Sequence, residues 1–166
     1  MAEPTSIDPR AAMHTAEHIL NAVMQRDFGS GRSLAAHLGE KKSKCDYAVP
    51  RPLNETDARR IEDAVNREIQ ADHAVTTFTV NRAEADARYN MGKVPAGATE
   101  IRIVRVGTLD VIPCVGEHAQ HTAQLGRFVI RSISMRNERV VRIRFTLDLT
   151  KENSFGTARR LHLEAG

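Results

Sequence analysis

The chain has 166 residues, of which 41% are hydrophobic and 27% are charged, and its 24 basic and 21 acidic side chains leave a net charge of +3. This length suffices for one ordinary hydrophobic core in a water-soluble globular protein. No apolar run approaches the roughly 20 residues of a membrane helix, and the net charge is too small to identify a nucleic-acid-binding protein. The segment from Met1 to Arg10 contains Glu3 and Asp8 and has no apolar stretch, which predicts a cytoplasmic protein without a secretory signal.

The first predicted element is a helix that begins after Asp8 and ends at Gly29. Asp8 is a good N-cap, Pro9 suits the first helical position, and apolar side chains recur between them and Gly29 at helical spacing. Two short strands, over 33–37 and 45–49, follow on either side of a basic loop and predict a hairpin.

A second helix is predicted from Asn54 to Ala71. Asn54 and Asp57 have the spacing of a capping box, and an apolar stripe follows at helical intervals. The β-branched segment 75–80 predicts a strand, and a short helix over 82–89 and a loop over 91–98 are expected after it.

The last third of the chain predicts three strands. The first covers 101–106 and is expected to run on through 109–112 toward Cys114, the second covers 128–135, and the third alternates apolar and polar residues over 140–149. We therefore predict an α+β fold with a mixed, largely antiparallel sheet packed against two main helices. One domain is expected over residues 1–166, with a core from about residue 8 to 150 and a C-terminal tail over 151–166.

Two pairs of side chains have the spacing of metal ligands. His14 and His18 are four residues apart, so a helix places both imidazoles on one face. Cys114 and His118 form a Cys-x-x-x-His pair on a loop after a predicted strand. A thiolate and three imidazoles suit zinc, which prefers tetrahedral nitrogen and sulfur ligands. We predict a zinc site formed by His14, His18, Cys114 and His118.

Each pair has an ordinary structural interpretation when it is taken alone. Two histidines at helical spacing are typical of a solvated helix face, and a cysteine near a histidine is typical of core packing. Their joint presence in a short chain favours the metal. His121 is an alternative to His118 as a ligand, whereas three histidines lack a partner at ligand spacing and are expected at the surface: His37, His73 and His162.

The first helix also permits a different function. The segment from His14 to His18 matches the His-x-x-Glu-His motif of inverzincin proteases, in which Glu17 would be the general base. A zinc metallopeptidase is therefore the main alternative. It leaves Cys114 and His118 without a role, and those proteases are much larger than 166 residues.

Three segments of this sequence match a known family. They are His14-Thr15-Ala16-Glu17-His18-Ile19-Leu20, Cys114-Val115-Gly116-Glu117-His118 and Thr122-Ala123-Gln124-Leu125-Gly126. On these segments the chain resembles the editing domain shared by alanyl- and threonyl-tRNA synthetases, most closely the short freestanding alanyl-tRNA editing proteins called AlaX. Ala123 and Gln124 depart from the family's Gly-Glu, and Val115 and Glu117 are closer to the short type than to larger members.

The resemblance implies a hydrolase that acts in trans on the acceptor end of mischarged tRNA(Ala), with Ser-tRNA(Ala) as the expected substrate. Zinc would either polarise a water toward the ester carbonyl or bind the α-amino group of the substrate. Glu117 is the nearest carboxylate that can activate a water, and no catalytic base is assigned.

The resemblance also points to residues that contact the substrate. Ser33 is closest to the position at which the family carries a hydroxyl that selects serine over alanine. Cations for tRNA phosphates cluster in sequence around the first hairpin: Arg32, Lys41, Lys42, Lys44 and Arg51. A third hypothesis is a non-catalytic RNA-binding module in which zinc only holds the fold together.

Overall fold

The computed structural model describes residues 7–150, so the predicted tail over 151–166 lies outside the described residues. The elements follow in this order: α1 (Pro9–Phe28), β1 (Ala35–Leu38), β2 (Ser43–Ala48), α2 (Glu55–Gln70), β3 (Val75–Asn81), α3 (Arg82–Arg88), β4 (Glu100–Val106), β5 (Asp110–Pro113), a 3₁₀ turn (Thr122–Leu125), β6 (Arg127–Asn137) and β7 (Val140–Asp148). The described helices include none with the length and hydropathy of a membrane span.

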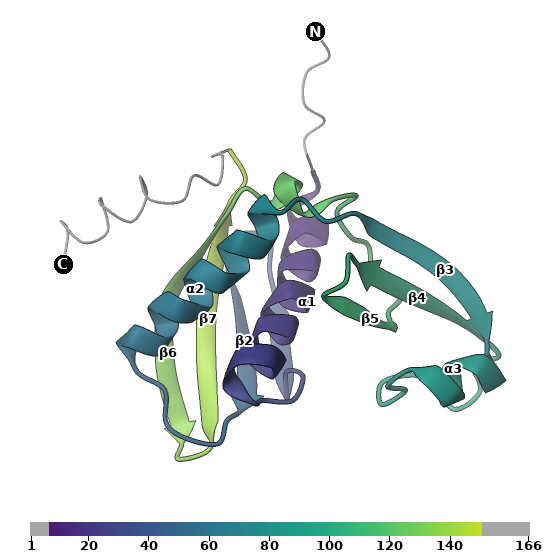
Figure 1. The fold of residues 1–166 in the computed structure, drawn as a ribbon, viewed down its shortest axis with the longest axis horizontal. Helices are drawn as coiled ribbons and strands as arrows, with labels where there is room; N and C mark the ends of the chain where they lie inside the picture. The colour runs from purple at the N-terminus through teal and green to yellow at the C-terminus, as the bar shows by residue number, and fades with distance from the viewer. Residues whose placement is uncertain (1–6, 151–166) are drawn as a thin grey trace, which may run out of the picture.

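The strands form two sheets that lie on either side of α1 (Figure 1). The larger sheet has the order β1-β2-β7-β6, and α1 and α2 cover one of its faces. The smaller sheet has the order β3-β4-β5 and lies beside α3. All strand pairs described in both sheets are antiparallel, which confirms the α+β class. The sequence predicted a single mixed, largely antiparallel sheet, and the structure has two fully antiparallel sheets instead.

Both long helices are capped by the residues that the sequence indicates. The carboxylate of Asp8 accepts a hydrogen bond of 2.9 Å from the Arg10 amide, and Gly29 ends α1 in the left-handed region at φ 65°. At the start of α2, the Asp57 amide donates to Asn54 at 3.1 Å and the Asn54 amide donates to Asp57 at 3.0 Å. These caps fix where the helices begin and end.

The core lies between the helices and the inner face of the larger sheet. The alternation predicted for the last strand is present, because Val141, Ile143 and Phe145 are buried while Arg144 is exposed. The inner face of α1 contributes fully buried apolar side chains that pack on this sheet: Met13, Ala16, Ile19, Leu20, Val23 and Met24. This packing orients the opposite side of α1 toward the smaller sheet.

One predicted strand is two strands in the structure. Instead of running on from Val106 toward Cys114, the chain turns at Gly107, which adopts φ 50°, and the Leu109 amide donates to the Val106 carbonyl at 2.9 Å. A positive φ is easily adopted by glycine, and the turn folds β5 back onto β4. The turn therefore brings Cys114 back to α1.

Candidate metal centre

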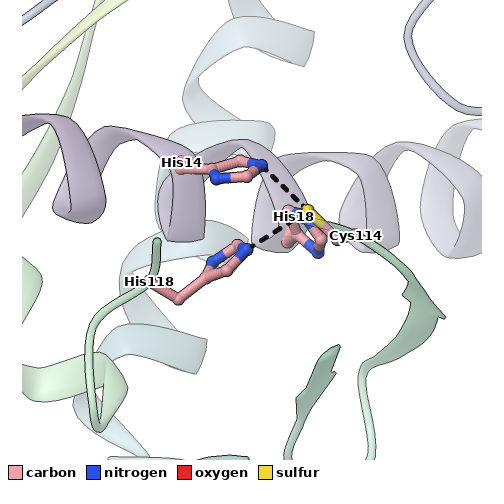
Figure 2. A group of neighbouring side chains, drawn as sticks. All are labelled: His14, His18, Cys114 and His118. Carbon is pink, nitrogen blue, oxygen red and sulfur yellow. Dashed lines mark hydrogen bonds between the residues drawn. The ribbon is translucent and has the colours of Figure 1, made fainter. Parts of the chain in front are cut away.

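Four side chains from α1 and from the loop after β5 converge on one point (Figure 2). The possible ligand atoms of His14, His18, Cys114 and His118 all lie within 4.8 Å of one another. Cys114 Sγ is 3.2 Å from His14 Nε2 and 3.5 Å from His118 Nε2. The structure thus brings together the four residues predicted as ligands, and the group can hold a metal ion.

The spacing of these atoms can be compared with that of a tetrahedral zinc. Zinc lies at roughly 2.0–2.1 Å from nitrogen and about 2.3 Å from sulfur, which separates a nitrogen and a sulfur ligand by about 3.6 Å. The two Cys114–histidine distances, 3.2 and 3.5 Å, are close to that nitrogen–sulfur separation. The donors also have the chemistry of a borderline-soft ion. The four residues therefore fit the metal that their spacing predicts.

The second ring nitrogen of each histidine faces an oxygen of the protein. His14 Nδ1 lies 3.1 Å from the Glu117 carbonyl, and His118 Nδ1 lies 3.0 Å from Thr15 Oγ1. The Thr15 hydroxyl donates to the Ala11 carbonyl at 3.2 Å, so its oxygen accepts the proton of His118 Nδ1. This tautomer leaves the Nε2 lone pair directed at Cys114, the arrangement usual for histidines that bind metals.

His18 is held from behind by an ion pair with Asp110. His18 Nδ1 is 2.8 Å from Asp110 Oδ2, although the ring is not aligned for a regular hydrogen bond. The Asp110 carboxylate also accepts two hydrogen bonds from the Arg32 guanidinium, at 2.7 and 3.2 Å. Asp110 and His18 are both buried. The Asp110 carboxylate thus orients the His18 ring, as carboxylates do behind many metal-binding histidines.

The loop that carries Cys114 and His118 is fixed by one arginine and one glycine. Arg102 Nη1 donates to the carbonyls of Cys114 and Gly116, each at 2.8 Å. A Cβ atom on Gly116 would collide with the His14 ring. The middle residue of Cys-x-x-x-His must therefore be small, because the loop backbone lies directly against the first helix.

The electrostatics of the group favour a thiolate. Burial opposes ionisation of Cys114, but contacts with His118, His14 and His18 outweigh it and lower the pKa of the thiol to about 3. Burial likewise opposes the charge on His18, but the contacts with Asp110 and Cys114 raise the pKa of this imidazole to about 9. These contacts favour the thiolate form of Cys114, which is the form that binds metals.

Comparisons with known proteins show which family the sequence is similar to. The model of the threonyl and alanyl tRNA synthetase second additional domain matches residues 101–144. Alanine–tRNA ligases from Ignicoccus hospitalis and Aeropyrum pernix are 31% and 33% identical over 80% of this chain, and the ligase from Caldivirga maquilingensis is 34% identical over 81%. The chain spans about 15% of the length of the first two ligases. The matches support an AlaX-like editing domain.

This result confirms the resemblance stated from the three sequence segments. The structure also has a cavity of about 780 Å³ beside the metal-ligand group. Its walls come from α1, from the loop before β4 and from the end of β5, and include His14, Glu17, His18 and Cys114. Figure 2 shows this group, of which His14, His18 and Cys114 line the cavity.

Ser33, the predicted substrate contact, lies behind this cavity and does not line it. Ser33 is buried, and its hydroxyl donates to Glu17 Oε1 at 3.1 Å. Asn21 Nδ2 donates to the same oxygen at 2.8 Å, and the Tyr47 hydroxyl donates to Asn21 Oδ1 at 2.7 Å. The wall of the cavity is formed instead by Glu17, whose Oε2 lies 3.8 Å from His18 Nε2.

The other described histidines lie outside the metal-ligand group. His121 forms an ion pair of 2.6 Å with Asp72 and is not part of the metal-ligand group. His37 is exposed, as expected, whereas His73 is half-buried and pairs with Glu68 at 2.8 Å. His162 lies outside the described residues. Glu117, the nearest carboxylate in sequence, is exposed, and only its backbone carbonyl contacts His14.

Sequence reasoning did not find the residues that orient the ligands. Asp110 and Arg102 are polar residues between apolar neighbours, and no spacing connects them with His18 or Cys114, whereas Thr15 lies within the His14–Leu20 segment without a signal that it contacts His118. The one available signal is an acidic residue inside an otherwise apolar strand segment, which has to be paired when it is buried.

Proposed function

We propose that this chain is a trans-editing deacylase that hydrolyses the ester of mischarged tRNA(Ala), with Ser-tRNA(Ala) as its substrate and zinc at the group of His14, His18, Cys114 and His118. The observation that carries the proposal is that this group adjoins a cavity of about 780 Å³ in an AlaX-like domain. We take residues 8–150 as the core of one editing domain and expect it to work in the cytoplasm, where charged tRNA is used.

When bound, zinc supplies a Lewis acid that polarises a water or the ester carbonyl, or binds the α-amino group of the substrate. The residues of this chain hold the reactants in place. Arg102 fixes the loop of Cys114 through two carbonyls, and Asp110 fixes the ring of His18. The cavity is large enough to bury an aminoacyl-adenosine end and keep it away from bulk water.

Selection of serine is proposed to depend on Ser33 acting through Glu17. Glu17 Oε1 already accepts hydrogen bonds from Ser33 and Asn21, so its orientation is fixed. Its Oε2 has no such donor in the described part of the chain and belongs to a residue that lines the cavity. A seryl hydroxyl can donate to this oxygen, whereas an alanyl methyl group would leave Oε2 of the buried carboxylate without a donor.

The peptidase alternative is less consistent with this arrangement. It requires Glu17 to act on a water, yet one carboxylate oxygen of Glu17 is held by two donors. It also gives no role to Cys114 and His118, whose side chains contact each other at 3.5 Å within the group. We therefore place Glu17 in substrate selection.

The decisive experiment is a panel of mischarged tRNAs incubated with the zinc-loaded protein. We expect release of serine from Ser-tRNA(Ala), sparing of Ala-tRNA(Ala), and loss of activity in a folded Cys114→Ala variant. Peptide cleavage that is lost in Glu17→Ala and kept in Cys114→Ala would support the peptidase instead. If metal removal unfolds the chain and neither assay shows turnover, zinc only holds together a non-catalytic module.

A further inference from the structure

The outer face of the larger sheet, opposite α1 and α2, has an unusual distribution of charge. Along β2 and β7, Asp46 stands directly opposite Arg142, and two hydrogen bonds of 2.8 and 3.0 Å join them. Two residues along the same face, Lys44 stands directly opposite Arg144. Like charges in directly opposed positions of a sheet destabilise the pair. The Lys44–Arg144 pair is therefore expected to destabilise the sheet, whereas the Asp46–Arg142 pair stabilises it.

The Lys44–Arg144 pair is part of a larger basic groove, which lies across β1, β2, β7 and β6. The groove has a volume of about 530 Å³, and its lining includes His37, Lys42, Lys44, Arg131, Arg144 and Thr146. Within residues 7–150, no acidic side chain forms a salt bridge with Lys42, Lys44, Arg131 or Arg144. No described helix covers this face (Figure 1). Among the described residues, the cations of the groove are thus left without a direct carboxylate partner.

The structure also separates the cations that the sequence grouped around the first hairpin. Arg32 is neutralised by Asp110 at 2.7 Å, and Arg51 is neutralised by Asp57 at 2.8 Å. Lys41, Lys42 and Lys44 remain, and of these Lys42 and Lys44 line the groove. Strand pairing adds Arg144 and Arg131, which are about a hundred residues away in the sequence. A basic surface that was only a local cluster in the sequence is thus continuous across four strands.

We propose that this basic groove binds the sugar–phosphate backbone of RNA. The four cations match the charge of a phosphate chain, and hydroxyl groups at Ser132, opposite Arg144, and at Thr146 can donate to phosphate oxygens. The described lining of the groove has no exposed Phe, Tyr or Trp side chain, so binding is mainly to phosphates and does not depend on base sequence. The inference rests on the proposed function only in naming the RNA as tRNA.

The test is the affinity of the protein for uncharged tRNA(Ala), measured by fluorescence anisotropy between 50 and 200 mM salt. Arg144→Glu removes one cation and places a carboxylate opposite Lys44, so two phosphate contacts are lost. We expect about 10- to 30-fold weaker binding near physiological salt and a plot of log K against log salt that is shallower by about two. Arg59→Glu, on the exposed side of α2, makes the same change in net charge and should bind as the parent does.

Three results would overturn the inference. The first is that Arg144→Glu binds tRNA with the parent's affinity and salt dependence. The second is that Arg59→Glu weakens binding as much as Arg144→Glu does, which would assign the effect to net charge. The third is that Arg144→Glu loses binding to vesicles containing anionic phospholipid while its tRNA binding stays intact, which would indicate that the groove binds a lipid surface. A parent protein that binds tRNA through this groove but deacylates no mischarged tRNA would overturn the proposed function and leave this inference standing.

Discussion

The metal-ligand group and the basic groove differ in whether their charged and polar groups have partners within the protein. Around the ligand group, protein partners occupy the outer nitrogens of His14, His18 and His118, and Arg32 neutralises Asp110. In the basic groove, Lys44 and Arg144 face each other, and no carboxylate in the described part of the chain forms a salt bridge with either. The first arrangement fixes a few atoms in place for a small ion and a small substrate. The basic groove leaves its positive charges available to bind a large external anion.

The largest effect is expected from removing the thiolate. In Cys114→Ser we expect kcat/KM for Ser-tRNA(Ala) to fall about 10³-fold or more, equal to roughly 4 kcal/mol of transition-state stabilisation. Metal content measured by atomic absorption should fall with it. Cys45→Ala is the matched control, because burial raises the pKa of Cys45 to about 12 and keeps it a neutral core thiol. Equal metal loss in both variants would contradict the assignment.

A smaller loss is expected when the partner of His18 is changed. Asp110→Asn keeps the shape of the side chain but removes the charge that orients the imidazole at 2.8 Å. We expect metal affinity, measured by competition with a chelator, to fall about 10- to 100-fold. Unchanged affinity in a variant with the parent's circular dichroism would show that the ligand group does not depend on its surroundings.

Substrate selection should respond to Glu17. In Glu17→Leu the cavity loses its carboxylate, and we expect the ratio of serine to glycine release from mischarged tRNA(Ala) to fall about 10- to 100-fold, the value of a hydrogen bond to a charged group. The ratio is insensitive to general loss of activity. Ser33→Ala should change it less, because Asn21 still holds Glu17. An unchanged ratio in Glu17→Leu would exclude this carboxylate from selection.

On the outer face of the sheet, the contribution of the Asp46–Arg142 ion pair to the free energy of unfolding should depend on pH. The hydrogen bonds from Arg142 lower the pKa of Asp46, so the pair stabilises the fold fully above the ordinary carboxyl pKa and loses this effect as pH falls through the lowered one. We expect Asp46→Asn to cost about 1 kcal/mol in urea unfolding at pH 7 and less at acidic pH. A cost that stayed constant down to acidic pH would argue against the ion pair.

The smallest effect is a gain. Arg144→Glu converts the like-charged register into the kind that Asp46 and Arg142 form, and we expect the free energy of unfolding to rise by about 0.2–1 kcal/mol. Thermal or urea unfolding of the variant and the parent gives this difference. A variant less stable than the parent would show that the Lys44–Arg144 register is not strained, and the contrast between the two regions would lose its energetic basis.

Local signals in the sequence predict most of the elements but not their pairing. Asp8, Pro9 and Gly29 delimit α1, and the Asn54–Asp57 capping box begins α2, since capping is decided by neighbouring residues. Gly107 was available as a turn signal, yet the apolar residues on both sides of it favoured one long strand. The division into two sheets depends on which strands meet in space, and no local pattern contains that information.

The site divides in the same way. The four ligands were predictable because His14 and His18, and Cys114 and His118, lie within one turn or one loop of each other. The contacts of Asp110 with His18 and of Ser33 with Glu17 were not predictable, because each is made between segments that only the fold brings together. Arg32 had the right residue type for tRNA but is used by Asp110, which only the structure reveals.

The central claim is that the early helix and the loop after β5 surround one metal ion with three imidazoles and one thiolate. Substitution of the metal with cobalt(II) tests it directly, because the visible spectrum reports both tetrahedral geometry and sulfur ligation. We predict a tetrahedral spectrum with a thiolate-to-cobalt band that disappears in Cys114→Ser and persists in Cys45→Ala. A spectrum without the thiolate band in the parent protein would contradict the account.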